Sequence, residues 1–286
     1  MASLKDLRRR IRATKSMQQI FKAMEMVAAA KLRRAQARAK AASPYSEKIS
    51  DMLANLSESA AELQHPLFKV REVKTTALVV ISADRGFAGA YNATVLRAAE
   101  QKLRAAERGS VQLVVVGRKG RDYLRRRGHP ILAAHTELPG EASLELARRI
   151  TNDLTQRFVS GEVDRVEILY THFVNAIVRK VRNETFLPIG ADAVRKPGTG
   201  GGAAIFEPDA ESIFAELLPR YATAKLYAAM ADSLASEHSA RMVAMGSARK
   251  NAGELVDALT LTRNRMRQAA ITREISELVG GAEALK

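Results

Sequence analysis

The sequence predicts an α/β protein in which two long terminal helices pair as an antiparallel coiled coil. Between them we expect a small, Rossmann-like, mostly parallel α/β domain. One observation is that the last 67 residues, 220–286, contain no proline, and another is the basic, proline-free segment 3–43 at the opposite end of the chain. The third is a change in pattern between about 74 and 190, where short β-branched runs alternate with amphipathic stretches.

The C-terminal segment repeats apolar and small residues in alternating steps of three and four. This 3.5-residue period predicts a helix supercoiled around a partner helix. A helix of this length would extend roughly 100 Å, far beyond the span of an ordinary domain helix. The expected seam consists of Met245, Ala248, Ala252, Leu255, Leu259, Thr262, Met266 and Ala269.

The N-terminal segment predicts the partner helix. Its alanines from position 28 onward favour helix strongly, and residues 45–63 are expected to continue the helix and end before Pro66. A narrow apolar stripe with basic flanks requires a second helix to cover it. The stripe consists of Leu4, Leu7, Ile11, Thr14, Met17, Ile20, Phe21, Met24, Val27 and Ala28.

The middle of the chain alternates between expected strands and helices. We expect strands at 75–82, 111–117, 130–134 and 166–171, with helices at 91–107, 119–127 and 143–159. A last antiparallel strand at 178–186 would pair through a hairpin. The glycine-rich segment 191–208 predicts a surface loop, and Pro208 and Pro219 are expected to precede the C-terminal helix. The predicted domains are therefore 1–63, 74–190, 191–208 and 209–286.

Composition excludes several classes of function. The 286 residues include no cysteine, so disulfides and thiolate metal sites are excluded, and the five histidines show no metal-ligand spacing. The sequence contains no run of about 18 apolar residues, so no membrane span is predicted. The start of the chain also lacks an apolar signal core. The net charge is +15, and residues 1–43 carry twelve Lys or Arg against two acids. Such a helix suits a nucleic acid, an anionic membrane surface, an acidic protein surface or plain solvation.

Two glycine-containing segments follow expected strands, where Rossmann-type folds bind phosphates. Residues 84–89 (DRGFAG) and 117–120 (GRKG) both lack the G-x-G-x-x-G spacing, and no P-loop motif occurs. Tight turns are therefore the favoured interpretation of both. Glu274 and Glu277 lie three apart on a helix, where contacts with Arg or Lys are commoner than acid–base chemistry. The sequence nominates no catalytic residue.

Both ends of the chain resemble the γ subunit family of F-type ATP synthases. Residues 11–31 (IRATKSMQQIFKAMEMVAAAK) resemble the N-terminal helix of that family. Residues 236–245 (SEHSARMVAM) and 269–282 (AAITREISELVGGA) resemble its C-terminal helix, and 271–284 resembles its most distinctive signature. The resemblance covers essentially the whole chain, because the α/β middle is also what such a subunit carries.

The resemblance implies a rotor shaft inside a hexamer of α and β subunits, with one copy per complex. The α/β domain would form a foot on the membrane-embedded c-ring beside the ε subunit, at the cytoplasmic face of a bacterial inner membrane. No cofactor, catalytic residue, nucleic acid partner or membrane span is expected. By their match to the motifs of the family, five residues are expected to contact other subunits: Met24, Arg241, Gln268, Thr272 and Glu274.

The chain also departs from the family pattern. Residues 86–90 read GFAGA where G-L-C-G-G is more usual, and Arg249 and Lys250 stand where relatives are often acidic or neutral. The cysteine-bearing insert of chloroplast relatives is missing, which indicates a bacterial source without redox control. A basic coiled-coil nucleic-acid binder and a nucleotide-dependent enzyme are the alternatives. Steep salt dependence would support the first, and nucleotide binding by the isolated chain would support the second.

Overall fold

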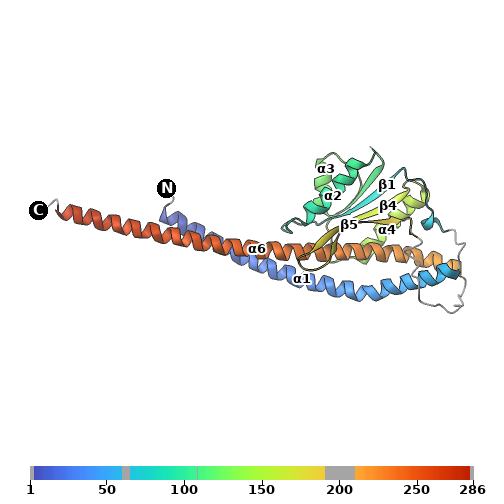
Figure 1. Cartoon of the computed structure of the whole chain (residues 1–286), viewed down its shortest axis with the longest axis horizontal. Helices are drawn as coiled ribbons and strands as arrows, with labels where there is room; N and C mark the ends of the chain where they lie inside the picture. The colour runs from blue at the N-terminus through green and yellow to red at the C-terminus, as the bar shows by residue number, and fades with distance from the viewer. Residues whose placement is uncertain (1–2, 60–64, 108, 191–209, 284–286) are drawn as a thin grey trace. The chain divides into compact units, whose positions relative to one another are not determined.

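Residues 3–59, 65–107, 109–190 and 210–283 are described by the structure, a computed structural model. The chain forms two compact units. One, the paired-helix unit, combines Met1–Ala28 with Arg241–Lys286, and the other, the sheet unit, is Ala29–Ala240. Helices α1 (Leu4–Ser59) and α6 (Ala210–Glu283) each contribute to both units (Figure 1).

Helix α1 begins at a side-chain cap and continues without interruption across position 44. The Ser3 hydroxyl accepts a hydrogen bond from the Asp6 backbone N–H at 3.1 Å and donates one to the Asp6 carboxylate at 2.9 Å. This reciprocal arrangement satisfies N–H groups that have no partner within the first turn. Helix α1 therefore includes the segment after Pro44, which the sequence predicted to continue the helix, as far as Ser59.

Helix α6 begins earlier than the prolines suggest. Pro208 precedes its first residue, Ala210, but Pro219 lies inside the helix, so the expectation that Pro219 precedes it was wrong. A proline in a helix interior costs about 3 kcal/mol because one backbone hydrogen bond is lost. Here residues on both sides of the proline, Leu218, Tyr221 and Ala222, are buried in the core of the sheet unit, which offsets that cost. The predicted glycine-rich loop, 191–208, lies outside the described residues.

The sheet of the sheet unit has five strands in the order β3-β2-β1-β4-β5. Strands β1 (Thr76–Ile81), β2 (Val111–Val116), β3 (Ile131–His135) and β4 (Arg165–Phe173) are parallel. Strand β5 (Arg179–Leu187) pairs antiparallel to β4 through the hairpin expected from the sequence. The mostly parallel sheet is thereby confirmed, with strand limits within two residues of those expected.

Helices cover both faces of this sheet. One face packs against α2 (Tyr91–Ala105) and α3 (Arg118–Arg126) through residues such as Val80, Val95 and Leu124. The other packs against α4 (Leu144–Ser160), the short 3-10 helix η1 (Pro66–Phe68) and the first turns of α6. Burial on both faces explains why β1 and β2 are nearly continuous apolar runs.

A half-buried histidine in the sheet unit, His135, should make the stability of the fold depend on pH. His135 ends β3, and burial, with a smaller contribution from the charge of Arg149, lowers its pKa below 6.5. A base with a depressed pKa in the folded state contributes stability above its unfolded pKa and loses it as the pH falls below 6.5. We expect His135→Gln to reduce the drop in melting temperature between pH 7.5 and 5.5, but not to abolish it, because burial depresses the pKa of His65 as well. Melting curves of both proteins at the two pH values, with His129→Gln as the control, test this; equal drops in the wild type and His135→Gln would contradict it.

Candidate subunit-binding surface

Two glycines of α6 face two long polar side chains of α1 in the paired-helix unit. A Cβ on Gly246 would lie 3.2 Å from the Glu25 carboxylate, and a Cβ on Gly253 would lie 2.9 Å from the Gln18 amide. The glycines are seven residues apart, and so are their partners. Along the contact, residue numbers rise on α6 as they fall on α1, so the two helices run antiparallel, as predicted.

These contacts place polar groups where the sequence predicted apolar ones. Leu7, Ile11 and Ala28 of α1 are buried as expected. In between, Gln18 and Glu25 turn toward α6 while their apolar neighbours turn outward. The expectation that Met17, Ile20 and Val27 lie in the helix–helix seam was therefore wrong: they are 48%, 56% and 55% exposed.

The outward residues form a second stripe on α1. Met17, Ile20, Met24 and Val27 are spaced by three, four and three, so they lie along one face of the helix. We call these four residues the outer stripe. Three of them are exposed and Met24 is partly exposed. An apolar stripe at helical spacing that faces solvent marks a surface for another protein.

The seam on α6 also departs from the heptad pattern. Met245 and Ala252 are buried as the heptad pattern predicts, but the next buried residue lies one position later than the pattern places it. Leu255 is 50% exposed while Val256 is only 8% exposed, so the placement of Leu255 in the seam was wrong. Thr262 and Ala269 are exposed as well. With 3.6 residues per turn, a helix drifts by about 20° per heptad from a strict 3.5-residue pattern, which moves such positions off the seam.

The C-terminal part of α6 carries apolar side chains that no part of the described chain covers. Every residue from 271 to 281 is exposed. Ile271, Ile275, Leu278 and Val279 lie at steps of four, three and one, along one face of the helix. We call residues 268–281 the α6 tip. Like the outer stripe, it presents an apolar face that the described residues leave uncovered.

The five expected contact residues all lie in the paired-helix unit. Met24 is part of the outer stripe, and Arg241 is half-buried at the start of the α6 portion of the unit. Gln268, Thr272 and Glu274 are exposed at the α6 tip, where the Thr272 hydroxyl donates to the Gln268 carbonyl at 3.0 Å. Three of the five are thus grouped on two turns of helix. Their contacts with other subunits stay a prediction.

An ion pair that sequence reasoning did not predict joins the two helices. The Arg249 guanidinium donates to the Glu25 carboxylate at 2.9 Å, and Lys250 lies 3.8 Å from Glu254 on its own helix. The two basic residues that depart from the family pattern therefore pair within this chain. In the sequence, this contact could have been found from a shared spacing: Gln18 and Glu25 are seven residues apart, and so are Gly246 and Gly253.

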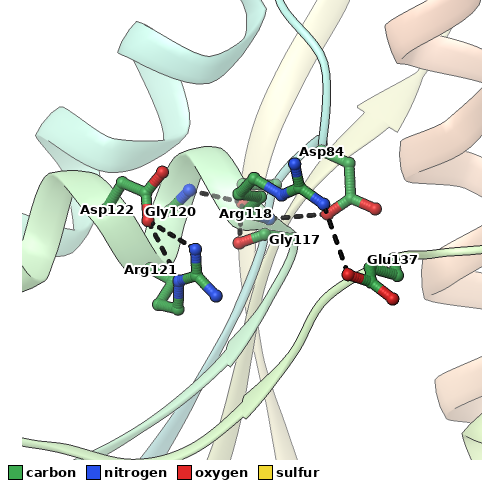
Figure 2. A network of polar contacts seen from close by, with 8 residues as sticks. Asp84, Gly117, Arg118, Gly120, Arg121, Asp122 and Glu137 are labelled. Atoms are coloured by element: carbon green, nitrogen blue, oxygen red, sulfur yellow. Dashed lines mark hydrogen bonds and ion pairs between the residues drawn. The ribbon is translucent and has the colours of Figure 1, made fainter.

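The two glycine-containing turns of the sheet unit are filled by the protein itself (Figure 2). Asp84, after β1, accepts hydrogen bonds from the backbone N–H of Arg118 at 2.7 Å and of Leu138 at 2.5 Å. The Asp84 carboxylate therefore lies at the N-terminus of α3, where a Rossmann-type fold would bind phosphate. In addition, the Arg118 guanidinium pairs with Glu137 at 3.6 Å. This geometry favours the turn interpretation over a nucleotide site.

A row of hydrogen bonds from α6, which we call the polar seam, fastens this helix to the sheet. The hydroxyl of Ser236 donates to the Thr171 carbonyl at 3.0 Å, and the hydroxyl of Ser239 donates to the Ala176 carbonyl at 2.6 Å. One turn earlier, Asp232 accepts from the Phe173 N–H at 3.1 Å and pairs with His172. Two of these three anchors are serines, and the contacts follow β4 into the hairpin.

Removing Asp232 is expected to loosen the polar seam. Asp232→Ala leaves the Phe173 N–H without its acceptor and should cost about 1–2 kcal/mol in unfolding free energy. Asp232→Asn keeps an oxygen acceptor and should cost less than half as much. Urea unfolding followed by hydrogen exchange at the amides of residues 171–174 measures both. Equal losses in the two variants would show that the lost charge, and not the lost acceptor, matters.

Within the described residues, no helix contains a stretch long and apolar enough to cross a membrane. In the same parts of the chain, His, Asp and Glu side chains form no cluster of three or more that would hold a metal ion.

Comparison with known proteins identifies the family. A family model described as ATP synthase matches residues 3–285. The ATP synthase gamma chains of Desulforamulus reducens and Moorella thermoacetica are each 46% identical over 286 residues, with all of both chains covered. The chain belongs to the ATP synthase gamma chain family. The resemblance seen in the terminal motifs is thereby confirmed, as is its bacterial character.

Solved structures support the same assignment. A central stalk and c-ring structure of the Tetrahymena thermophila mitochondrial ATP synthase matches with a TM-score of 0.62 and 27% identity, over 80% of this chain and 99% of that one. A Euglena gracilis mitochondrial ATP synthase structure matches with a TM-score of 0.70 at 20% identity, over 99% and 94% of the chains. The second likeness shows the fold alone, which is the coiled coil and α/β arrangement expected from the sequence.

Proposed function

We propose that this chain is the central rotor shaft of the F1 sector of an ATP synthase. It couples proton translocation through the membrane ring to conformational change at the catalytic nucleotide sites of the surrounding hexamer. The proposal rests on one observation about the paired helices. In α1, the polar side chains of Gln18 and Glu25 face α6, whereas the apolar outer stripe faces solvent. A helix pair that exposes apolar rows on its outside requires a covering protein.

The shaft acts by biasing which conformation each catalytic subunit adopts. A rotor with two different helices presents a different face to each surrounding subunit, so it stabilises different states at different sites. The contacts between the two helices support this role, because the Glu25–Arg249 ion pair and the two glycine contacts fix how the helices lie against each other. In this proposal the chain itself is non-catalytic and binds no cofactor for its coupling role.

The partners follow from the two units. The outer stripe and the α6 tip face the α and β subunits, with Met24, Arg241, Gln268, Thr272 and Glu274 among the contacts. The sheet unit forms the foot beside the ε subunit and the c-ring, and the polar seam transmits torque from the foot to α6. One copy serves each complex, peripherally, at the cytoplasmic face of a bacterial membrane.

The division of the chain into domains with boundaries at residues 63, 74, 190 and 208 stays a prediction.

Reconstitution tests the proposal directly. The α and β subunits are purified as a hexamer with and without this chain, and ATP hydrolysis is measured together with rotation of a probe fixed to the sheet unit. We expect rotation coupled to hydrolysis only when the chain is present. If the probe does not rotate during hydrolysis, or if the rate of hydrolysis is the same with and without the chain, the proposal is wrong.

A further inference from the structure

A cavity of about 360 Å³ lies in the sheet unit and plays no part in the proposed shaft function. Three elements enclose it: the middle of α1, the loop between β3 and α4, and the first half of α6. Its volume lies in the range of pockets that bind small organic molecules. The cavity therefore has room for a ligand, and its lining indicates which kind.

One wall of the cavity is cationic. Lys31, Arg34 and Arg38 line it from successive turns of α1, and Glu141 of the loop is the acidic member of the lining. Arg38 pairs with Glu141, which leaves Lys31 and Arg34 with no ion pair to any part of the chain that the structure describes. The Lys31 ammonium lies 3.6 Å from the place where a Cβ on Gly140 would stand, so it reaches across to the loop. Two uncompensated cations, one turn apart, suit an anionic group.

The opposite wall is apolar. Tyr227, Ala231 and Leu234 of α6 line it at steps of four and three, so they lie along one face of that helix. Ala231 is buried, and the other two are half-buried. This wall would cover a flat or extended apolar group, and the cationic wall would bind its charged end.

The place of the cavity in the fold supports a ligand site independently of its lining. A smaller hollow of about 30 Å³ shares Glu141, Ala142 and Leu234 with it and reaches Ser82 and Val116. These two residues stand at the carboxyl ends of β1 and β2, the edge at which open α/β sheets bind ligands. The turns at this edge are closed by Asp84, whereas the loop at 139–142 leaves space beneath α1.

We propose that this cavity binds an amphiphilic organic anion, with a phosphate or carboxylate on Lys31 and Arg34 and an apolar body on the α6 wall. A bound ligand would join α1, the loop at 139–142 and α6. Because it binds only the folded arrangement, it would stabilise the sheet unit by an amount that rises with the logarithm of its concentration once that concentration exceeds the Kd.

Calorimetric titration of the full chain with 1-naphthyl phosphate tests the proposal. We expect one saturable site with a Kd of about 1 mM or lower. Inorganic phosphate, which has only the charged end, and 1-naphthol, which has only the apolar body, should each bind at least about tenfold more weakly. Equal binding of inorganic phosphate or of 1-naphthol, or absence of a saturable site, would overturn the proposal.

Variants locate the site. Arg34→Gln should weaken 1-naphthyl phosphate about tenfold, because an ion-paired hydrogen bond is lost. Arg33→Gln removes the same charge from the adjacent exposed position, which does not line the cavity, and should change the Kd by less than about twofold. Ala142→Leu partly fills the cavity and should weaken 1-naphthyl phosphate about fivefold while leaving weak binding of inorganic phosphate unchanged. Identical effects of Arg33→Gln and Arg34→Gln would show non-specific attraction to a basic helix and sink the proposal.

Discussion

Replacing Ile20 by glutamate is expected to weaken the binding of this chain to the α/β hexamer by about 30-fold or more. Ile20 lies in the middle of the outer stripe and is 56% exposed in the chain alone. A charge introduced there must be desolvated when the hexamer covers the stripe. The isolated chain should keep most of its stability, since more than half of this side chain is already exposed to solvent in it.

Binding of fluorescently labelled chain to purified hexamer, measured at several concentrations, checks the effect. Met26→Glu is the matched control, because Met26 is equally exposed at 58% but lies on the other flank of α1, outside the outer stripe. We expect it to weaken binding by less than about threefold. If both variants bind as tightly as the wild type, the outer stripe is not the covered surface; if both are weakened equally, contact extends around the whole helix.

The fold could be predicted because its local signals agree with one another. Continuous β-branched runs such as 111–116 suit strands buried on both faces, and both faces are covered here. Pro219 was misjudged because proline is a local signal, whereas the burial of Leu218 and Tyr221 that outweighs it depends on the tertiary structure. A sequence shows that a proline destabilises a helix, but it does not show how much stabilisation the surrounding tertiary packing provides.

The binding surface was harder to predict than the fold. The terminal motifs identified the family and suggested contact residues, but periodicity alone assigned Met17, Ile20 and Val27 to the interior. Apolar residues were assumed to face inward, and that assumption fails for a helix pair that other subunits are expected to surround. The inward positions of Gln18 and Glu25 follow from the absence of side chains on Gly246 and Gly253, a relation between two helices more than 200 residues apart in sequence.

Gly117→Ala is expected to destabilise the sheet unit by about 3 kcal/mol or more. Gly117 joins β2 to α3 with a φ of +101° and a ψ of 138°, a conformation that other residues adopt only under strain. A Cβ there would lie 2.3 Å from the Ser82 carbonyl oxygen at the end of β1, so β1 and the start of α3 would have to separate. The shift would also break the hydrogen bond from the Gly120 N–H to the Ser82 hydroxyl, 2.9 Å long.

Gly128→Ala separates backbone strain from the clash. Its φ is +76°, but nothing lies within 4 Å of a Cβ at that position, so we expect a loss of only about 1–2 kcal/mol. The signal must come from the sheet, because the circular dichroism of the long helices would hide it. Hydrogen exchange of β1 and β2 peptides in increasing urea provides such a signal. If the two variants lose equal stability, the close packing of Gly117 on Ser82 contributes nothing, and the glycine is required only by its backbone angle.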